Sequence, residues 1–358
     1  MTKDDTANTE PLRVDDERTQ QAICELVESV GGDADSFDGR LITQLIQTAL
    51  KLIPDGHDTG QLKLLNSAMK EIRYAYRVFN RYRETKKISI FGSARTPEDH
   101  PDYIRAKEFS AAMADHGWMS ITGAGDGIMK AGHEGPTRQS SFGLSIRLPF
   151  ETSANTVIEG DPKLINFRYF FTRKLMFMSH ADAVAVFPGG FGTQDELFET
   201  LTLVQTGKSN IVPIIMLEGE GGVYWDHWRN YVDKNLLENG WISREDPGLY
   251  FIAKTIDEAV EHVVRFYRVY HSSRYVRDAF VIRLKQELTD EQLNQLSDEF
   301  GSIIGSGRIE KVSPFREESD HLDLPRIAFD YTKRDLAVLR LMIDRINEFA
   351  GSPADVSR

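Results

Sequence analysis

The feature that most constrains the fold of this chain is a run of short apolar segments that alternate with helical segments between residues 85 and 272. The apolar segments are bounded by turn residues and are nearly continuous in apolar side chains. Strands of this kind are buried on both faces, which is typical of a parallel sheet covered by helices on each side. The pattern therefore predicts an α/β, Rossmann-like domain. We expect strands at residues 87–93, 118–123, 141–149, 155–160, 181–187 and 211–219, and helices at 101–117, 166–181, 192–207 and 223–239.

The segments that flank this domain follow other patterns. Residues 1–18 are charged and almost free of large apolar side chains, so we expect a disordered tail. Residues 19–84 show helical periodicity and predict a helical N-terminal region. Residues 273–358 predict a small β-α-β-β-α module, whose first helix begins with a capping box made by Thr289 and Gln292.

Composition excludes several classes of protein. The 358 residues carry a formal net charge of -12, so we expect no general attraction to nucleic acid or to an anionic membrane. The single cysteine, Cys24, excludes a disulfide framework and a thiolate zinc site. No apolar run reaches the roughly 18 residues of a membrane helix, and the N-terminus is too polar for a secretory signal. We therefore expect a cytoplasmic protein.

Three glycine-bearing turns each follow a predicted strand, namely 91–96 (FGSART), 122–129 (TGAGDGIM) and 188–193 (PGGFGT). In an open parallel sheet such turns share the edge where ligands bind, and glycines allow a ligand to approach the backbone. One turn alone could simply be tight, but three on one edge favour a phosphate-bearing ligand. The dinucleotide and Walker A patterns are not matched.

Charged residues occur where the pattern predicts burial or phosphate binding. The helix at residues 166–180 is apolar nearly all round, which predicts a buried helix, yet it contains Arg173 and Lys174. A buried cation requires an anionic partner or a route to the surface, so a structural ion pair and a snorkelling side chain both remain open. Asp195 and Glu196 lie in the first turn of the helix after the third glycine turn, where they would also stabilise the helix dipole.

These motifs together resemble the LOG family of cytokinin-activating phosphoribohydrolases and related bacterial nucleotide nucleosidases. The sequence PGGFGTQDE is similar to the PGGxGTxxE signature of that family. The RK pair of FRYFFTRKLMF lies on the helix before it, and one predicted strand separates the two motifs. The similarity extends from FGSART to LTLVQTGK, over about half the chain. The second turn departs from the common family sequence at Ala124, Asp126, Lys130, His133 and Glu134, which concerns base specificity more than the reaction.

The resemblance implies the roles of individual residues. The catalytic arginine and glutamate of the family correspond to Arg173 and Glu196, and its phosphate-binding positions to Ser93, Gly189, Gly190, Gly192 and Thr193. Further substrate-binding candidates from the turns and the RK pair are Gly92, Gly123, Gly125, Gly127, Met129 and Lys174.

The resemblance also implies an activity, which is hydrolysis of the N-glycosidic bond of nucleoside 5'-monophosphates such as AMP, giving a free base and ribose 5-phosphate. It implies no cofactor, no metal and a homo-oligomer, either a dimer or a larger assembly. The alternatives are a non-catalytic nucleotide or cofactor carrier of the same fold, and a scaffold in which the flanking modules matter most. The older label of the family, lysine decarboxylase, would require pyridoxal phosphate on a lysine with a carboxylate facing the pyridinium nitrogen. Nothing in the sequence points to such a lysine except Lys174, which the RK motif already explains.

Overall fold

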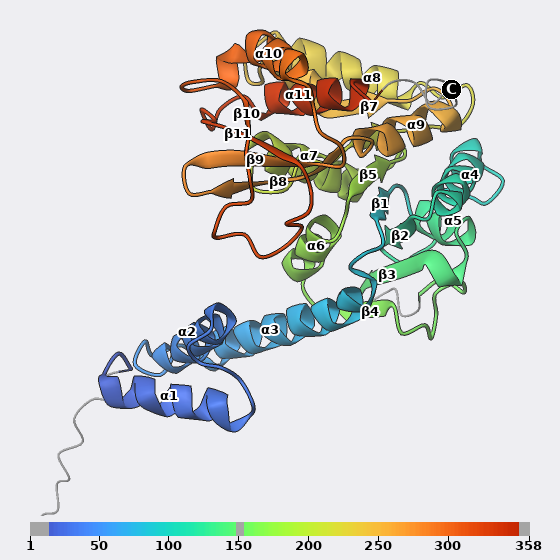
Figure 1. The fold of residues 1–358 in the computed structure, drawn as a ribbon. Coiled ribbons are helices and arrows are strands. Elements are labelled where there is room, and N and C mark those ends of the chain that lie inside the picture. The colour runs from blue at the N-terminus through green and yellow to red at the C-terminus, as the bar shows by residue number, and fades with distance from the viewer. Residues whose placement is uncertain (1–13, 148–153, 351–358) are drawn as a thin grey trace, which may run out of the picture. The chain divides into compact units, whose positions relative to one another are not determined.

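The computed structural model describes residues 14–147 and 154–350. The chain divides into two compact units, Met1–Lys70 and Glu71–Arg358, which are described separately below (Figure 1). The predicted tail at residues 1–18 lies mostly outside the described residues, as do residues 148–149 of the third predicted strand and residues 351–358 of the C-terminal module.

The first unit is helical. It contains α1 (Glu17–Ser29), α2 (Phe37–Lys51) and the start of α3 (Thr59–Phe79), which is followed by the 3-10 turn η1 (Asn80–Tyr82). The side chain of Ser36 accepts a hydrogen bond from the backbone N–H of Gly39 and so caps the N-terminus of α2.

The second unit is built on a seven-stranded parallel sheet with the strand order β4-β3-β2-β1-β5-β6-β7. This arrangement confirms the predicted fold class. The strands are β1 (Lys87–Phe91), β2 (Met119–Thr122), β3 (Ser141–Ile146), β4 (Leu164–Phe167), β5 (Ala183–Val186), β6 (Ile214–Met216) and β7 (Tyr250–Ile252). Because β1 pairs with β2 on one side and with β5 on the other, the strand order reverses between β1 and β5. Such a switch point is where open α/β sheets form their ligand crevice.

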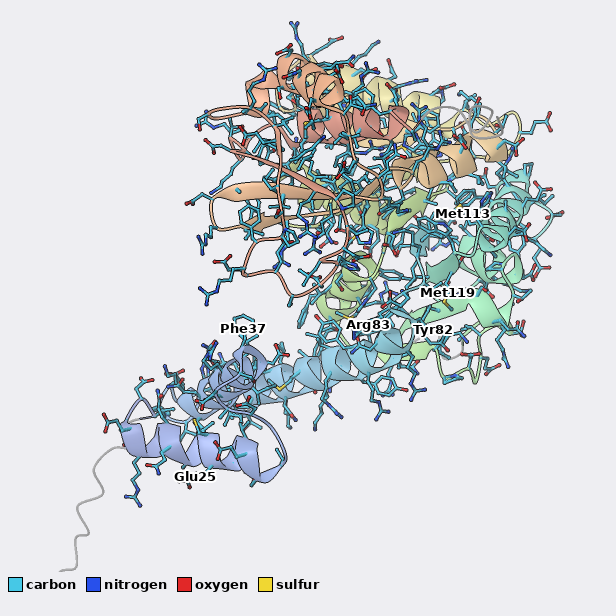
Figure 2. All side chains as sticks on the ribbon, in the orientation of Figure 1. Glu25, Phe37, Tyr82, Arg83, Met113 and Met119 are labelled. Atoms are coloured by element: carbon cyan, nitrogen blue, oxygen red, sulfur yellow. The ribbon has the colours of Figure 1, made fainter. Side chains whose placement is uncertain are left out.

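Helices cover the sheet on both sides (Figure 1). In Figure 1, α4 and α5 lie on one side of β1 and β2, and α6 and α7 lie on the other. Met113 of α4 and Met119 of β2 are both buried in the resulting core (Figure 2). The helices that follow the strands of this sheet are α4 (Pro101–Asp115), α5 (Ile128–Glu134), α6 (Phe170–Ser179), α7 (Phe191–Gln205), α8 (Tyr224–Tyr231), the π-helix η3 (Val232–Leu237) and α9 (Ile256–Phe266).

The segment before α6 corrects two sequence predictions. Residues 166 and 167 end strand β4 instead of beginning a helix, whereas residues 155–160, which were predicted as a strand, form turns. The prediction that the helix is buried was also wrong, because the side chains of Phe170, Phe171 and Leu175 are 52%, 51% and 46% exposed. Thr172, Met176 and Phe177 are the fully buried residues of α6, and Met178 is partly buried against the core. Apolar character all round a helix therefore did not mean burial here.

The C-terminal segment forms a four-stranded antiparallel sheet in the order β10-β11-β9-β8, with two helices. Its elements are β8 (Tyr270–Val276), β9 (Ala279–Leu284), α10 (Asp290–Glu299), β10 (Glu310–Lys311), β11 (Arg326–Phe329) and α11 (Leu336–Glu348). The capping box of Thr289 and Gln292 is confirmed at the start of α10. Strands β7 and β8 and helix α9 were not predicted from the sequence. Strand β7 is only three residues long, whereas the buried residues of α9 (Ala259, Val260, Val263 and Phe266) recur at helical spacing, so periodicity could have identified this helix.

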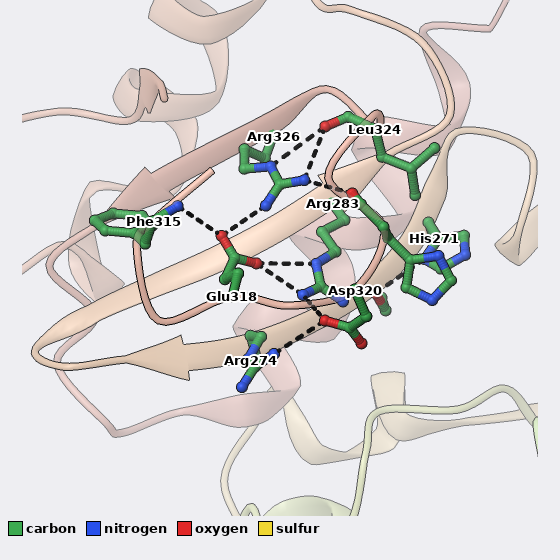
Figure 3. A network of polar contacts seen from close by, with 10 residues as sticks. His271, Arg274, Arg283, Phe315, Glu318, Asp320, Leu324 and Arg326 are labelled. Atoms are coloured by element: carbon green, nitrogen blue, oxygen red, sulfur yellow. Dashed lines mark hydrogen bonds and ion pairs between the residues drawn. The ribbon is translucent and has the colours of Figure 1, made fainter. Parts of the chain in front are cut away.

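A buried ionic network holds the loop between β10 and β11 onto this sheet (Figure 3). The carboxylate of Glu318 accepts hydrogen bonds from Arg283 at 2.7 Å and from Arg326 at 2.6 Å. All three side chains are buried, and Asp320 provides a second acceptor for Arg283 at 2.7 Å. Each buried charge is therefore compensated, as burial requires.

Candidate active site

The structure brings the three glycine turns together at the carboxyl ends of β1, β2 and β5. The backbone N–H of Ser93 in the first turn donates to the carbonyl oxygen of Pro188 in the third, at 3.1 Å. The carbonyl oxygen of Ser93 accepts from the N–H of Ile128, at the end of the second turn, at 3.0 Å. Ser93 thus links all three turns through its backbone.

Close packing between the turns explains some of the glycines. A Cβ atom on Gly189 would lie 2.1 Å from the hydroxyl oxygen of Thr193. A Cβ atom on Gly127, whose φ is +59°, would lie 2.3 Å from the carbonyl oxygen of Ser93. In contrast, a Cβ atom on Gly190 or Gly192 would meet nothing within 4 Å. Packing within the chain therefore requires glycine at 127 and 189 but does not require it at 190 and 192.

A cavity of about 850 Å³ opens where the turns meet. Most of the site residues proposed from the sequence line it, namely Gly92, Ser93, Gly123, Met129, Arg173, Gly189, Gly190, Gly192, Thr193 and Glu196. Gly125, Gly127 and Lys174 do not line it. Sequence reasoning missed other lining residues, including Arg95, Phe170, Phe177, Phe191 and Gln194. This volume is typical of a small-molecule site.

Glu196 lies at the wall of this cavity, and the residue is only 9% exposed. Helix α7 begins directly after Gly190, so Glu196 comes from the second turn of the helix. Burial raises the pKa of the Glu196 carboxyl, and the nearby charges of Lys174 and Arg173 oppose that rise. Glu196 is therefore a partly desolvated carboxylate whose ionisation depends on two neighbouring cations.

Lys174 is surrounded by carboxylates of helix α7. Its ammonium nitrogen lies 2.8 Å from Asp195, 3.4 Å from Glu196 and 2.5 Å from Glu199. Burial alone would lower the pKa of Lys174, but the hydrogen bonds to Asp195 and Glu199 raise it to about 12. The structural ion pair considered from the sequence is thus found for Lys174, and Asp195 has a partner in addition to its position near the helix start. Glu199 was missed because nothing in its local sequence distinguishes it.

Arg173 extends from α6 between two aromatic rings. Its guanidinium carbon lies 5.1 Å from the ring centre of Phe170 and 5.6 Å from that of Phe177. A Cβ atom on Gly123 would lie 3.7 Å from a terminal nitrogen of Arg173, which shows how closely the second turn approaches the guanidinium. Arg173 therefore lies at the cavity wall, where its guanidinium group makes cation–π contacts with two aromatic rings.

A chain of polar side chains supports the third turn from behind. The Tyr224 hydroxyl donates to the carbonyl oxygen of Gly189 at 2.7 Å and accepts from the Gln194 amide at 2.6 Å. The indole N–H of Trp228 donates to the Gln194 side-chain oxygen at 3.0 Å. These contacts join α8 to the turn and to the first turn of α7.

The second turn is held by a buried histidine. His133 bonds through Nε2 to the carbonyl oxygen of Phe142 at 3.0 Å, and its Nδ1 lies 3.1 Å from the amide nitrogen of Asn155. The same amide donates to the carbonyl oxygen of Gly125 at 2.9 Å. Burial lowers the pKa of His133, so it is neutral in this network. His133 and Asn155 thus hold the turn at Gly125 from behind the cavity.

Two kinds of feature are absent from residues 14–147 and 154–350. No group of three or more His, Cys, Asp or Glu side chains there could hold a metal ion. No helix in the same ranges is long and apolar enough to cross a membrane.

Comparisons with known proteins agree on one family. The sequence profile of a family described as "possible lysine decarboxylase" matches residues 123–263. The chain is 30% identical over 162 residues to a protein of Oryza sativa subsp. japonica named probable cytokinin riboside 5'-monophosphate phosphoribohydrolase LOG4, and this match covers 42% of the chain and 67% of the rice protein. It is 29% identical over 140 residues to the cytokinin riboside 5'-monophosphate phosphoribohydrolase of Mycobacterium tuberculosis (strain ATCC 25618 / H37Rv), covering 38% of the chain and 72% of that protein.

Among solved structures, the molybdenum cofactor carrier protein of Chlamydomonas reinhardtii is similar, with a TM-score of 0.35 and 18% identity over 51% of this chain and 97% of that one. The rice phosphoribohydrolase is matched at 30% identity over 67% of its own length. The chain therefore belongs to the LOG family.

Proposed function

We propose that this protein hydrolyses the N-glycosidic bond of nucleoside 5'-monophosphates such as AMP, releasing the free base and ribose 5-phosphate. The observation that carries the proposal is the position of Glu196, a buried carboxylate with cationic neighbours, on the same cavity as the three glycine turns. The relatives named above are phosphoribohydrolases of a riboside 5'-monophosphate, which is a substrate of this class.

The 5'-phosphate would be anchored by the third turn. Gly190 and Gly192 line the cavity, and neither needs to be glycine for packing within the chain. A ligand oxygen that approaches the backbone closely would require the absence of a side chain at these positions. The N-terminus of α7, the Thr193 hydroxyl and Ser93 would then supply the hydrogen bonds.

The sugar would be cleaved by Glu196 and water. As the bond between C1' and the base nitrogen breaks, positive charge develops on the ribose, and an adjacent carboxylate stabilises it. Glu196 would also orient a water molecule, which adds its oxygen to C1' and gives up a proton, while the departing base gains one. Arg173 would keep Glu196 ionised and contact the substrate.

The base would occupy the apolar part of the cavity. Met129, Phe170 and Phe177 line this part, and aromatic rings suit the flat face of a purine or pyrimidine. Lys174 is poorly suited to decarboxylation through pyridoxal phosphate, because three carboxylates surround its ammonium group and raise its pKa to about 12. A lysine that forms a Schiff base needs a lowered pKa instead.

Incubation of the purified protein with AMP, GMP, CMP and IMP, followed by an assay for free base, tests the proposal. Glu196→Gln should reduce release by about 10²- to 10⁴-fold, because a neutral amide cannot stabilise the developing cation. Calorimetry should show that this variant still binds AMP.

Glu199→Gln is the matched control. Glu199 lies on the same helix and also contacts Lys174, but it does not line this cavity. We expect this variant to keep most of its activity. Release by Glu196→Gln at the wild-type rate would refute the role of Glu196, and AMP recovered intact after long incubation with the wild type would favour the nucleotide carrier.

A further inference from the structure

A second cavity of about 930 Å³ lies between helices α6 and α7 and the C-terminal sheet. Five cationic side chains line it, and only one acidic side chain, Glu199, does so. The cations are Lys174, Lys208, Arg274, Arg277 and Lys333. This local excess of positive charge stands out in a chain whose formal net charge is -12. A cavity with this lining attracts an anion.

Two of these cations are available for a ligand. Arg274 contacts Asp320 at 3.3 Å (Figure 3), and Arg277 contacts Glu317 at 2.7 Å. Lys208 and Lys333, however, have no ion pair with any residue of 14–147 or 154–350, and both are exposed. Their ammonium groups can therefore pair with phosphate oxygens at little cost in broken contacts.

The backbone at the rim is held in an unfavourable conformation. Arg277 has a φ of +54°, and Lys333 has a φ of +59°. The left-handed region costs roughly 1–2 kcal/mol for a residue with a Cβ atom, and glycine or asparagine usually occupies it. For Arg277 the two-residue hairpin turn between β8 and β9 accounts for this conformation, and that turn brings its side chain to the cavity.

The floor of the cavity provides an aromatic surface. Tyr275 is 46% exposed, and its ring centre lies 5.1 Å from that of Phe280 and 5.6 Å from the ammonium group of Lys333. A partly exposed ring next to a cation suits a nucleobase that carries phosphates nearby. Lys174 is already held by Asp195, Glu196 and Glu199, which leaves the cations at four positions for a ligand, with the two arginines shared with their carboxylates. Four separate positions suit a chain of phosphates better than a single phosphate, which carries only about two negative charges.

We propose that this cavity binds a nucleoside polyphosphate, with its phosphates at Lys208, Lys333 and the two arginines and its base against Tyr275. A ligand bound in this cavity would affect the first cavity through Lys174 and Glu199. Both residues line the second cavity and contact each other, and Lys174 also contacts Glu196 in the first. Phosphate oxygens that draw Lys174 away from Glu196 would reduce activity towards AMP. This coupling rests on the proposed function, whereas the binding itself does not.

Calorimetry on the full chain tests binding, with GTP, ATP and inorganic triphosphate as the probes. The double variant Lys208→Gln/Lys333→Gln should weaken binding of the better nucleotide by about tenfold or more, because it loses two charge-assisted contacts. Lys234→Gln is the matched control, since Lys234 is exposed in η3 and lines neither cavity. Glu196→Gln should bind the nucleotide as the wild type does.

Three results would overturn the proposal. These are no detectable binding of GTP or ATP at millimolar concentration, equal binding by the double variant, and binding of inorganic triphosphate as tight as that of both nucleotides. Binding that responds to the double variant in a protein that hydrolyses no nucleotide monophosphate would refute only the proposed function. Hydrolysis of AMP without nucleotide binding at Lys208 and Lys333 would refute only the second site.

Discussion

At the scale of the residue, Lys174 controls the environment of Glu196. The carboxyl pKa of Glu196 is raised by burial and lowered by Lys174 and Arg173. The proposed reaction needs the ionised carboxylate, so activity should fall as the pH drops through this pKa. Because the pKa is raised, the fall should lie above the value of about 4.3 for a free glutamate.

Replacing Lys174 should change the pH at which activity falls on the acidic side, that is, the acidic limb of the pH profile. Lys174→Gln removes the largest of the charges that lower the pKa of Glu196, so this pKa should rise and the acidic limb of the kcat/KM profile should shift to higher pH. Lys234→Gln should leave the profile unchanged. An acidic limb at the same pH in Lys174→Gln and the wild type would show that Lys174 does not act through Glu196.

A substitution at Gly192 should distinguish an effect on stability from an effect on ligand binding. It lies in the first turn of α7, and an added Cβ atom would meet nothing within 4 Å. Gly192→Ala should therefore raise the free energy of unfolding by up to about 1 kcal/mol, because alanine favours the helix. If a phosphate approaches this backbone, the same change should weaken AMP binding.

Gly189→Ala provides the comparison for Gly192→Ala. Its Cβ atom would lie 2.1 Å from the Thr193 hydroxyl, so this variant should lose stability as well as affinity. Thermal unfolding and AMP calorimetry on both variants measure the two effects. An unchanged AMP affinity in Gly192→Ala would contradict the assignment of the phosphate to this turn.

At the scale of the element, the C-terminal sheet depends on Glu318. This side chain is fully buried between Arg283 and Arg326. Burial alone would raise the pKa of Glu318, but hydrogen bonds from Arg283, Phe315 and Arg326 hold it below its usual value. The lowered pKa means that its contribution to stability is present above the pKa of an unfolded glutamate and is lost as the pH falls through the folded value.

Glu318→Gln should lower the free energy of unfolding by about 3 kcal/mol, because two buried arginines lose their shared carboxylate. The adjacent Glu317→Gln is the control. Glu317 is exposed and pairs with the exposed Arg277, so its loss should cost less than about 1 kcal/mol. Urea denaturation at neutral pH compares the two, and equal costs would contradict the role of the buried network.

At the scale of the whole molecule, we expect a homo-oligomer, as the resemblance to the LOG family implies. Helix α6 leaves Phe170, Phe171 and Leu175 about half exposed, which is unusual for adjacent large apolar side chains. Light scattering should give at least twice the mass of one chain. A monomer at micromolar concentration would contradict this expectation.

Across the whole molecule, some features are determined by the local sequence and others are not. Strand and helix periodicity predicted β1, β2 and β5, because apolar strands buried on both faces have a distinctive pattern. The glycine turns after those strands were predicted to share an edge, since parallel strands end on the same side. Glu196 and Arg173 were identified through family motifs and lie on one cavity.

Only the tertiary structure decided which side chains meet. The contacts of Lys174 with Glu196 and Glu199 join α6 to α7, and the support of Gly189 by Tyr224 joins two segments that are 35 residues apart. The exposure of α6 and the short strand β4 likewise depend on what packs against them. Local sequence determined the elements because their periodicity is local. The site's charges and cavities were decided by the tertiary structure, because they depend on distances between residues that are remote in the chain.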